Sequence, residues 1–181
     1  MPEEEKTIKD FEQLTGLLKK KEICKRTVVV WPEEDHTQEA ILQATHEGFI
    51  SPILVCSERT KKIFADREAL QAVTAENPEE ASRIAVKIIR EQKADIIMKG
   101  FVNTDVLLRA ILDKEHGILP RGAVLTHITV TKIPEYPKLL FFTDAAVIPY
   151  PTEEQRKAQI KYVIDFCHAF NIDCPKISLI H

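Results

Sequence analysis

Three short segments of the sequence carry the side chains best suited to chemistry. In the first, an apolar stretch over residues 96–98 runs through Lys99 and Gly100 into a helix start at Asn103. Ligands of open α/β sheets bind at the carboxyl ends of strands, and the unpaired amide groups of a helix start favour phosphate. The segment therefore predicts an anion site, with Lys99 and Arg109 as its cations. The alternative is an ordinary turn and helix cap whose two cations are solvated.

The second segment is Leu125–Val130, which has the pattern of a β-strand. Because side chains alternate along a strand, Thr126 falls on one face and His127 on the other. Histidine titrates near neutral pH and can act as a general acid or base, so His127 is a candidate catalytic residue. A lone histidine in a strand can equally be a hydrogen-bonded structural group, and the spacing does not separate the two roles.

The third segment is Leu139–Ala146, in which an apolar strand ends in the hydroxyl of Thr143 and the carboxylate of Asp144. Strand ends are where the sites of α/β proteins are built, which makes Asp144 a second candidate for catalysis. Aspartate also commonly bonds the backbone of the turn that follows it, and that alternative stays open.

Strands and helices must alternate along most of the chain to position these segments. Asp35 with Gln38 predicts a capped helix that Gly48 ends, and Asn77 with Pro78 predicts the start of another. Further helices are expected over 8–18, from about residue 60 and over 103–117, and strands over 27–31, 50–56 and 94–98, with a brief apolar stretch over 70–73. This alternation predicts an α/β fold in three layers, a largely parallel sheet with helices on both faces.

The rhythm changes after residue 123. Strand-like runs over 124–132 and 138–142 are separated by too few residues for a helical crossover, so an antiparallel strand pair is expected. Thr152 and Gln155 predict a capped last helix, and 177–180 has the pattern of a buried strand with no helix after it. We therefore expect an N-terminal α/β domain over 1–146 and the truncated start of a second α/β domain over 147–181.

Composition excludes several classes of protein. The 25 basic residues nearly match the 28 acidic ones, and the net charge of -3 offers no positive field to a nucleic acid. The four cysteines are scattered without ligand spacing, so no metal site is expected. The chain has neither a signal-peptide core nor a run of the ~20 apolar residues that span a membrane, which predicts a cytoplasmic protein. The GxGxxG and GxxxxGK[ST] fingerprints are absent.

Taken together, the three segments resemble the phosphate acetyl/butyryltransferase family, most closely its butyryl branch. The matching residues stand in the same order and with similar spacing: Met98-Lys99-Gly100 with Val102, Thr104, Leu107-Leu108-Arg109-Ala110 and Leu112, then Leu125-Thr126-His127, then Leu140-Phe141-Phe142-Thr143-Asp144-Ala145-Ala146 and Pro151. Members exchange an acyl group between coenzyme A and inorganic phosphate without a metal in the chemical step, so the resemblance implies acyl-CoA and phosphate as substrates and no cofactor.

The resemblance also implies roles for individual residues. Lys99 and Arg109 would hold phosphate, with Gly100, Asn103 and Thr104 beside them; Thr126, His127 and Asp144 would serve catalysis, with Thr143 binding substrate in the same cleft. Thr126 stands where the family commonly has serine, and Ile148 where it usually has asparagine.

Family enzymes are considerably longer than this chain. They are homodimers with a second domain that carries the base and the principal phosphate-binding residues of the acetyl-transferring members. The resemblance therefore implies a homo-oligomer, and the isolated 181-residue chain is expected to be inactive. The alternative function is a non-catalytic module that binds coenzyme A or a phosphorylated metabolite.

Overall fold

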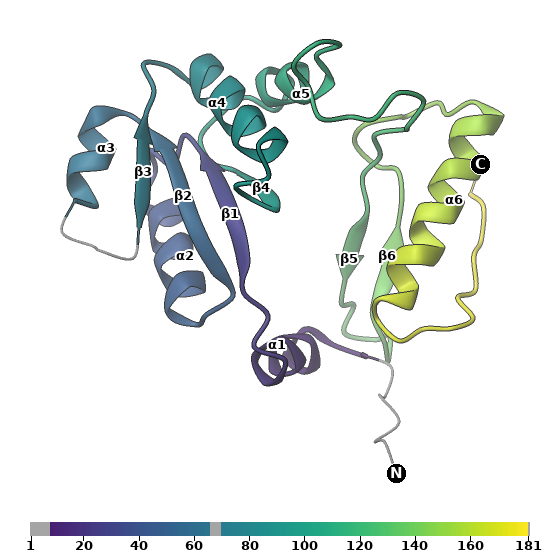
Figure 1. The fold of residues 1–181 in the computed structure, drawn as a ribbon. Coiled ribbons are helices and arrows are strands. Elements are labelled where there is room, and N and C mark those ends of the chain that lie inside the picture. Colours follow the sequence, from purple (N-terminus) through teal and green to yellow (C-terminus); the bar gives the residue numbers. More distant parts are fainter. Residues whose placement is uncertain (1–7, 66–69, 181) are drawn as a thin grey trace. The chain divides into compact units, whose positions relative to one another are not determined.

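A four-stranded parallel sheet organises residues 18–120, one of two compact units in a computed structural model of the protein. The other unit combines residues 8–17 with 121–180. The structure describes residues 8–65 and 70–180, and Figure 1 labels the elements of both units. The predicted domain boundary at residue 147 stays a prediction.

Strand β1 (Lys25–Val30) lies inside the sheet, between β2 (Ile50–Cys56) and β4 (Ile96–Lys99), and β3 (Gln71–Thr74) pairs with β2. The order is β3-β2-β1-β4, and all three pairings are parallel. In this register Val28 lies opposite Ile53 on one side and Ile97 on the other. The predicted parallel sheet is confirmed.

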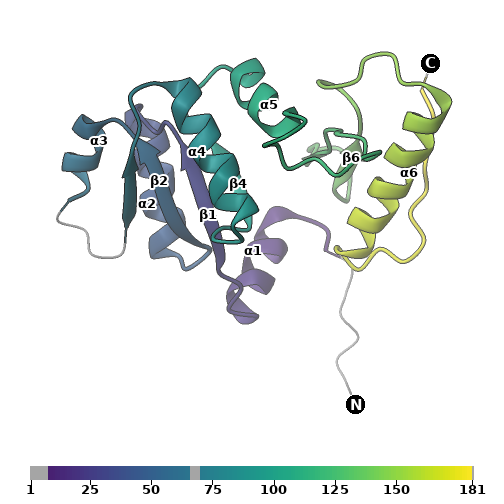
Figure 2. The ribbon, with the colours of Figure 1, turned by 45° about the horizontal axis from the view of Figure 1, so that its top comes forward.

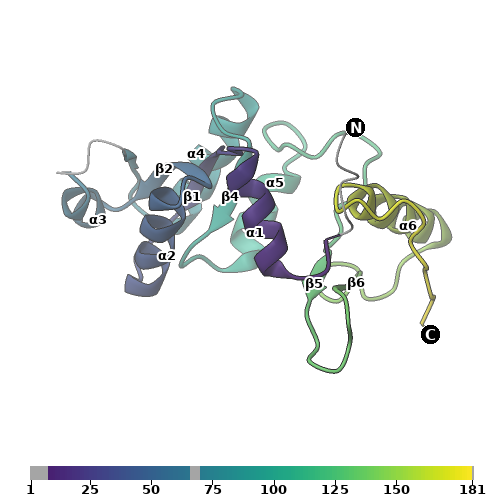
Figure 3. The same cartoon turned by 90° about the horizontal axis from the view of Figure 1, so that it is seen from below.

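Helices cover both faces of this sheet, which confirms the three predicted layers. Helices α2 (Asp35–His46) and α3 (Glu58–Ile63) lie on one face, and α4 (Pro78–Arg90) and α5 (Thr104–Leu112) on the other (Figures 2 and 3). The alternation of β1 divides the core: Val29 packs with Ile41 of α2, whereas Val28 and Val30 pack with Ala85 of α4. All of these side chains are buried.

The helix starts follow the predicted capping chemistry in part. The side chain of Asn77 accepts a hydrogen bond from the Glu80 amide at the start of α4, as predicted. Helix α2 differs, because Glu34 is its N-cap and makes no side-chain cap bond. Gln38 donates to the carbonyl of Pro32 at 2.9 Å instead, so the predicted box of Asp35 and Gln38 is wrong.

The unit of residues 8–17 and 121–180 is built around the predicted antiparallel pair. Strand β5 (Thr129–Thr131) pairs with β6 (Leu140–Phe142), and α6 (Glu153–His168) runs alongside them (Figure 1). Helix α6 starts with the predicted capping box of Thr152 and Gln155. The ring of Phe141 meets those of Phe166 and Phe170 at 6.1 and 5.2 Å between centroids, which joins the helix to the strands.

Two strand predictions in this unit are corrected. Residues 124–128 are not strand, so the run expected over 124–132 shortens to the three residues of β5. Residues 177–180 have no regular structure and are exposed, so the buried strand expected there is wrong. In the unit of residues 18–120, the helix predicted over 103–117 is shorter than expected, since α5 spans only Thr104–Leu112. Apolar alternation marks possible strands, but a strand forms only where a partner strand pairs with it.

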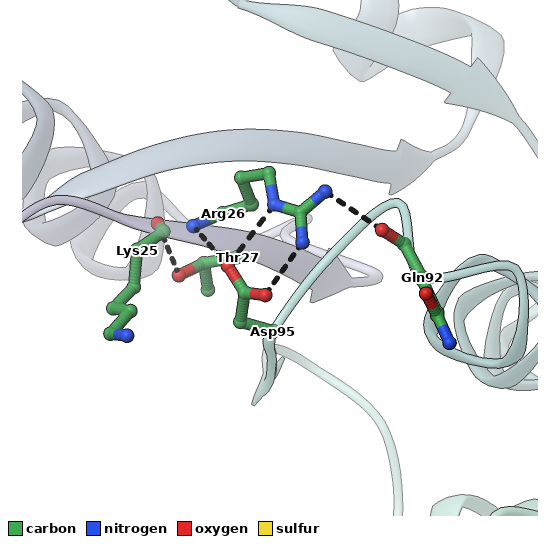
Figure 4. Close-up of polar contacts among 5 residues, drawn as sticks. All are labelled: Lys25, Arg26, Thr27, Gln92 and Asp95. Carbon is green, nitrogen blue, oxygen red and sulfur yellow. Dashed lines mark hydrogen bonds and ion pairs between the residues drawn. The ribbon is translucent and has the colours of Figure 1, made fainter.

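A double ion pair fixes the amino ends of β1 and β4 (Figure 4). Helix α1 (Phe11–Lys20) precedes β1 in the chain. The guanidinium of Arg26 donates two bonds to the carboxylate of Asp95, at 3.1 and 2.7 Å. A third goes to the carbonyl of Gln92 at 2.7 Å. The bond from Arg26 lowers the pKa of Asp95, so the Asp95 carboxylate keeps its charge beside Arg26.

Within the described residues no helix is long and apolar enough to cross a membrane.

Candidate functional site

The first group of predicted site residues lies where the winding of the sheet reverses. The chain goes from β1 outward to β2 and β3, then returns through α4 to β4 on the other side of β1. Ligands of open α/β sheets bind at such a switch point, outside the carboxyl ends of the two strands. Here β1 ends at Val30, which Trp31 follows, and β4 ends at Lys99, which Gly100 follows.

The backbone at this switch point is tightly constrained. Trp31 has a φ of 57°, a strained conformation for a bulky side chain that proteins concentrate at functional sites. A Cβ on Gly100 would lie 2.6 Å from the carbonyl oxygen of Val30 and 2.7 Å from that of Trp31. Glycine is therefore required there by close backbone approach. The Gly100 amide donates to Val30 at 2.9 Å, so it is already engaged rather than open to a phosphate.

Helix α5 begins directly after this turn and leaves backbone donors open. Asn103 is its N-cap by position but makes no side-chain cap bond. Within the described part of the chain, the amides of Asn103, Thr104 and Asp105 have no hydrogen-bond partner. These three residues are exposed. Free amides and the positive end of the helix dipole together make the start of α5 attractive to an anion.

The two predicted cations both have protein partners. The Lys99 ammonium donates to the carbonyls of Val102 at 2.9 Å and of Gly100 at 3.4 Å, so it sits over the turn between β4 and α5. Arg109 pairs with Asp105 one turn back at 2.9 Å, and its side chain is 80% exposed. An anion at the start of α5 would therefore compete with Asp105 for Arg109, whereas Lys99 already lies on the connecting turn.

The second group, Thr126, His127, Thr143 and Asp144, is brought together in the unit that contains β5 and β6. The hydroxyl of Thr126 donates to the carboxylate of Asp144 at 2.8 Å and lies 3.2 Å from the hydroxyl of Thr143. The Thr143 hydroxyl donates to the carbonyl of His127. Residues 16 to 18 positions apart thus share one hydrogen-bonded cluster just beyond the strand pair.

Asp144 is held as a carboxylate by four donors. The amides of Ala146 and Val147 donate to Oδ1 at 2.9 and 2.8 Å, while Thr126 and the amide of His127 donate to Oδ2. Burial alone would raise the pKa of Asp144, but these hydrogen bonds outweigh it and lower the pKa to about 2. The bonds to residues 146 and 147 are the turn role left open by the sequence, and the other two tie that turn to residues 126 and 127.

The imidazole of His127 is the least engaged member of the second group. Both ring nitrogens lie 3.5 Å from the hydroxyl of Thr129, at the limit of a hydrogen bond. The ring is half-buried. The ring nitrogens of His127 thus have no close partner within the described residues, whereas four donors occupy the carboxylate of Asp144.

Glu33 plays a structural part that sequence reasoning missed. It follows β1, and its carboxylate accepts bonds from the amide and hydroxyl of Ser57 at 2.9 and 2.8 Å and from the hydroxyl of Thr60 at 2.7 Å. These bonds join the carboxyl ends of β1 and β2. The partners stand 24 and 27 residues away, and no local spacing announces such a contact.

The fold and the first group define the class of this protein: a doubly wound α/β protein with a helix start of unpartnered backbone amides beside its switch point. More narrowly, the chain belongs to the phosphate acetyl/butaryl transferase family, whose sequence model matches residues 68–181. The match includes both groups of predicted site residues.

Named relatives belong to both branches of the family. The chain is 33% identical to a phosphate butyryltransferase of Clostridium beijerinckii, over 94% of this chain and 57% of the relative. It is 30% identical to a probable phosphate butyryltransferase of Bacillus subtilis, over 92% of this chain and 57% of that one. A phosphate acetyltransferase of Thermotoga maritima is 27% identical over 86% and 54%. The chain thus spans little more than half the length of these relatives.

A solved structure has the same fold. The crystal structure of a branched-chain phosphotransacylase from Enterococcus faecalis superposes with a TM-score of 0.68 at 18% sequence identity, over 80% of this chain and 51% of that one. At this identity the likeness concerns the fold.

Proposed function

We propose that the complete gene product containing this chain transfers an acyl group between coenzyme A and inorganic phosphate, forming acyl phosphate and free coenzyme A. Three relatives named as phosphate butyryl- or acetyltransferases support this reaction class. The proposal includes coenzyme A as a substrate, no resident metal or other cofactor and a homodimer, all from the family resemblance, together with the cytoplasmic location expected from the sequence.

The observation that carries the proposal is the open helix start after Gly100. Phosphate needs hydrogen-bond donors and positive charge, and α5 offers the free amides of Asn103 and Thr104 together with its dipole. Lys99 adds a full charge on the adjoining turn. Arg109 would add a second when the anion replaces Asp105 as its partner.

The chemistry assigns different demands to the two groups of residues. A phosphate oxygen attacks the thioester carbonyl carbon and forms a carbon–oxygen bond; the carbon–sulfur bond then breaks, and coenzyme A leaves as a thiolate that takes up a proton. The first group meets the demand for phosphate binding. The resemblance assigns Thr126, His127 and Asp144 to the chemical step and Thr143 to substrate binding. Of these, we assign the proton transfer to His127, because its ring nitrogens make only the 3.5 Å contact with the Thr129 hydroxyl.

The test is the release of free thiol from butyryl-CoA and acetyl-CoA in the presence of phosphate. We expect turnover by the complete gene product and at least a tenfold loss in Arg109→Ala, because a lost charge-assisted contact costs about 1.5–3 kcal/mol. Lys157→Ala is the matched control, since Lys157 forms an exposed (i, i+4) ion pair with Glu153 just as Arg109 does with Asp105.

Two results would contradict the proposal. Wild-type rates in a folded Arg109→Ala variant would show that Arg109 does not hold phosphate. A complete gene product that binds coenzyme A in calorimetry without turnover would establish the non-catalytic binding module instead.

A further inference from the structure

An exposed aromatic ring stands in the middle of the switch-point turn. Phe101 lies between Lys99–Gly100 and Asn103–Thr104 and is 59% exposed. Isolated apolar side chains on a surface are common, so exposure alone carries no function. Phe101 differs because of where it lies: at the carboxyl edge of β4, between the two parts of the proposed phosphate site.

Hydrogen bonds and burial fix the backbone before and after Phe101. The Phe101 amide donates to the carbonyl of Trp31 at 2.8 Å, and the preceding amide of Gly100 donates to Val30 at 2.9 Å. The next residue, Val102, is buried, and its carbonyl accepts a hydrogen bond from the Lys99 ammonium. The ring is therefore presented to solvent from a fixed point. A binding surface benefits from such an arrangement, since little backbone entropy is lost when a ligand docks.

The proposed reaction places the acyl chain near this ring. Acyl transfer requires the thioester carbonyl carbon to come within bonding distance of a phosphate oxygen, so the acyl chain starts at the phosphate site. Three residues of extended chain span at most about 11 Å, which bounds the distance between the Cα atoms of Phe101 and Thr104. An acyl chain of a few carbons and a phenylalanine side chain together cover that distance.

We propose that Phe101 packs against the acyl chain of the acyl-CoA substrate and sets the preference for chain length. This inference rests on the proposed acyl transfer. Each methylene that moves from water onto an apolar surface favours binding. A butyryl chain has two more methylenes than an acetyl group, so packing them against the Phe101 ring favours butyryl by about tenfold.

The experiment compares kcat/KM for butyryl-CoA and acetyl-CoA in the complete gene product and its variants. We expect Phe101→Ala to lower the butyryl-to-acetyl ratio by about tenfold while the KM for phosphate stays unchanged. Phe101→Leu should retain most of the wild-type ratio. Ile96→Ala is the matched control, because Ile96 is an apolar residue, 44% exposed, at the amino end of β4, whereas Phe101 follows the carboxyl end. An unchanged ratio in a folded Phe101→Ala variant overturns the inference.

A binding measurement separates this inference from the proposed function. Trp31, the single tryptophan of the chain, accepts the Phe101 amide through its carbonyl, so its fluorescence reports on this turn. If the wild type releases no thiol, the proposed function fails and the fluorescence titration decides. Tighter binding of butyryl-CoA than acetyl-CoA that is lost in Phe101→Ala supports the contact with the acyl chain. Equal affinities, or no binding of either thioester, overturn it.

Discussion

Single residues in the second group show how hydrogen bonds can hold a charge in place. Asp144 keeps a pKa of about 2 because four donors favour its carboxylate. A carboxylate whose pKa is lower in the folded than in the unfolded state stabilises the fold above its unfolded pKa, and the stabilisation disappears as the pH falls through the folded pKa. The contribution of Asp144 should therefore be complete at neutral pH and vanish between about pH 4 and pH 2.

Asp144→Asn tests this dependence. We expect a lower unfolding free energy than the wild type at pH 6, because the amide nitrogen cannot accept the bonds from Thr126 and His127. The difference should shrink below pH 4, as measured by urea denaturation at pH 6, 4 and 2.5. Asp173→Asn, an exposed position, serves as the control. A constant difference across this range would mean that Asp144 does not titrate as an isolated, hydrogen-bonded carboxylate.

Gln159 is a residue whose removal should stabilise the protein. It is buried on α6, and its Nε2 has no hydrogen-bond partner within the described residues. A buried donor without a partner keeps its full desolvation cost, so an apolar side chain of similar volume should be better tolerated. We expect Gln159→Met to raise the unfolding free energy by about 1 kcal/mol in urea denaturation. Lys157→Met, on the exposed side of the helix, should change little; a loss of stability in Gln159→Met would show that the amide has a partner in solution.

At the scale of elements, Gly100 and Gly16 differ in the space available for a side chain: backbone crowds Gly100, whereas Gly16 lies in an open position of a helix. A Cβ on Gly100 would meet backbone atoms of Val30 and Trp31 within 2.9 Å, whereas nothing lies within 4 Å of one on Gly16, inside helix α1. We expect Gly100→Ala to lower the unfolding free energy by about 1–3 kcal/mol, because β1 and β4 must move apart. Gly16→Ala should raise it by up to about 1 kcal/mol. Thermal unfolding of both variants checks the pair, and equal effects would contradict the argument.

Elements with their own start signals were predictable from the sequence. Strand β2 has the predicted bounds, and α4 and α6 begin at the predicted caps of Asn77 and Thr152. Residues 124–128 and 177–180 were not, because their apolar alternation needs a neighbouring strand that the structure does not pair with them. The cap of α2 failed for a related reason: the Gln38 amide binds the carbonyl of Pro32 instead.

At the scale of the whole molecule, the segments that carry the site were predictable but their long-range partners were not. Lys99, Gly100 and Asn103 are consecutive parts of one strand–turn–helix passage, so local pattern places them together. The bonds of Thr126 to Asp144, of Glu33 to Ser57 and of Arg26 to Asp95 join residues 18 to 69 positions apart. Such contacts depend on the folded chain, and residue spacing does not encode them.

Residues 18–120 should fold as an independent unit. They contain a four-stranded sheet whose two faces are each covered by helices, with separate buried clusters around Val28 and Val29. A fragment of roughly 100 residues with a complete core is large enough to be stable alone. We expect the fragment 18–120 to show a helical and sheet circular-dichroism spectrum and one cooperative thermal transition.

The same fragment contains the whole proposed phosphate site, which allows the site to be tested without catalysis. A ligand that binds only the folded state stabilises it, by about 1.4 kcal/mol when phosphate is present at ten times its Kd, and this raises the Tm of a domain of this size by several degrees. Sodium chloride of equal ionic strength is the control for screening. Lys99→Ala should lose most of the phosphate effect, because the ammonium lies on the turn that leads into α5. A folded fragment whose Tm rises no more in phosphate than in chloride would mean that the start of α5 binds no phosphate by itself.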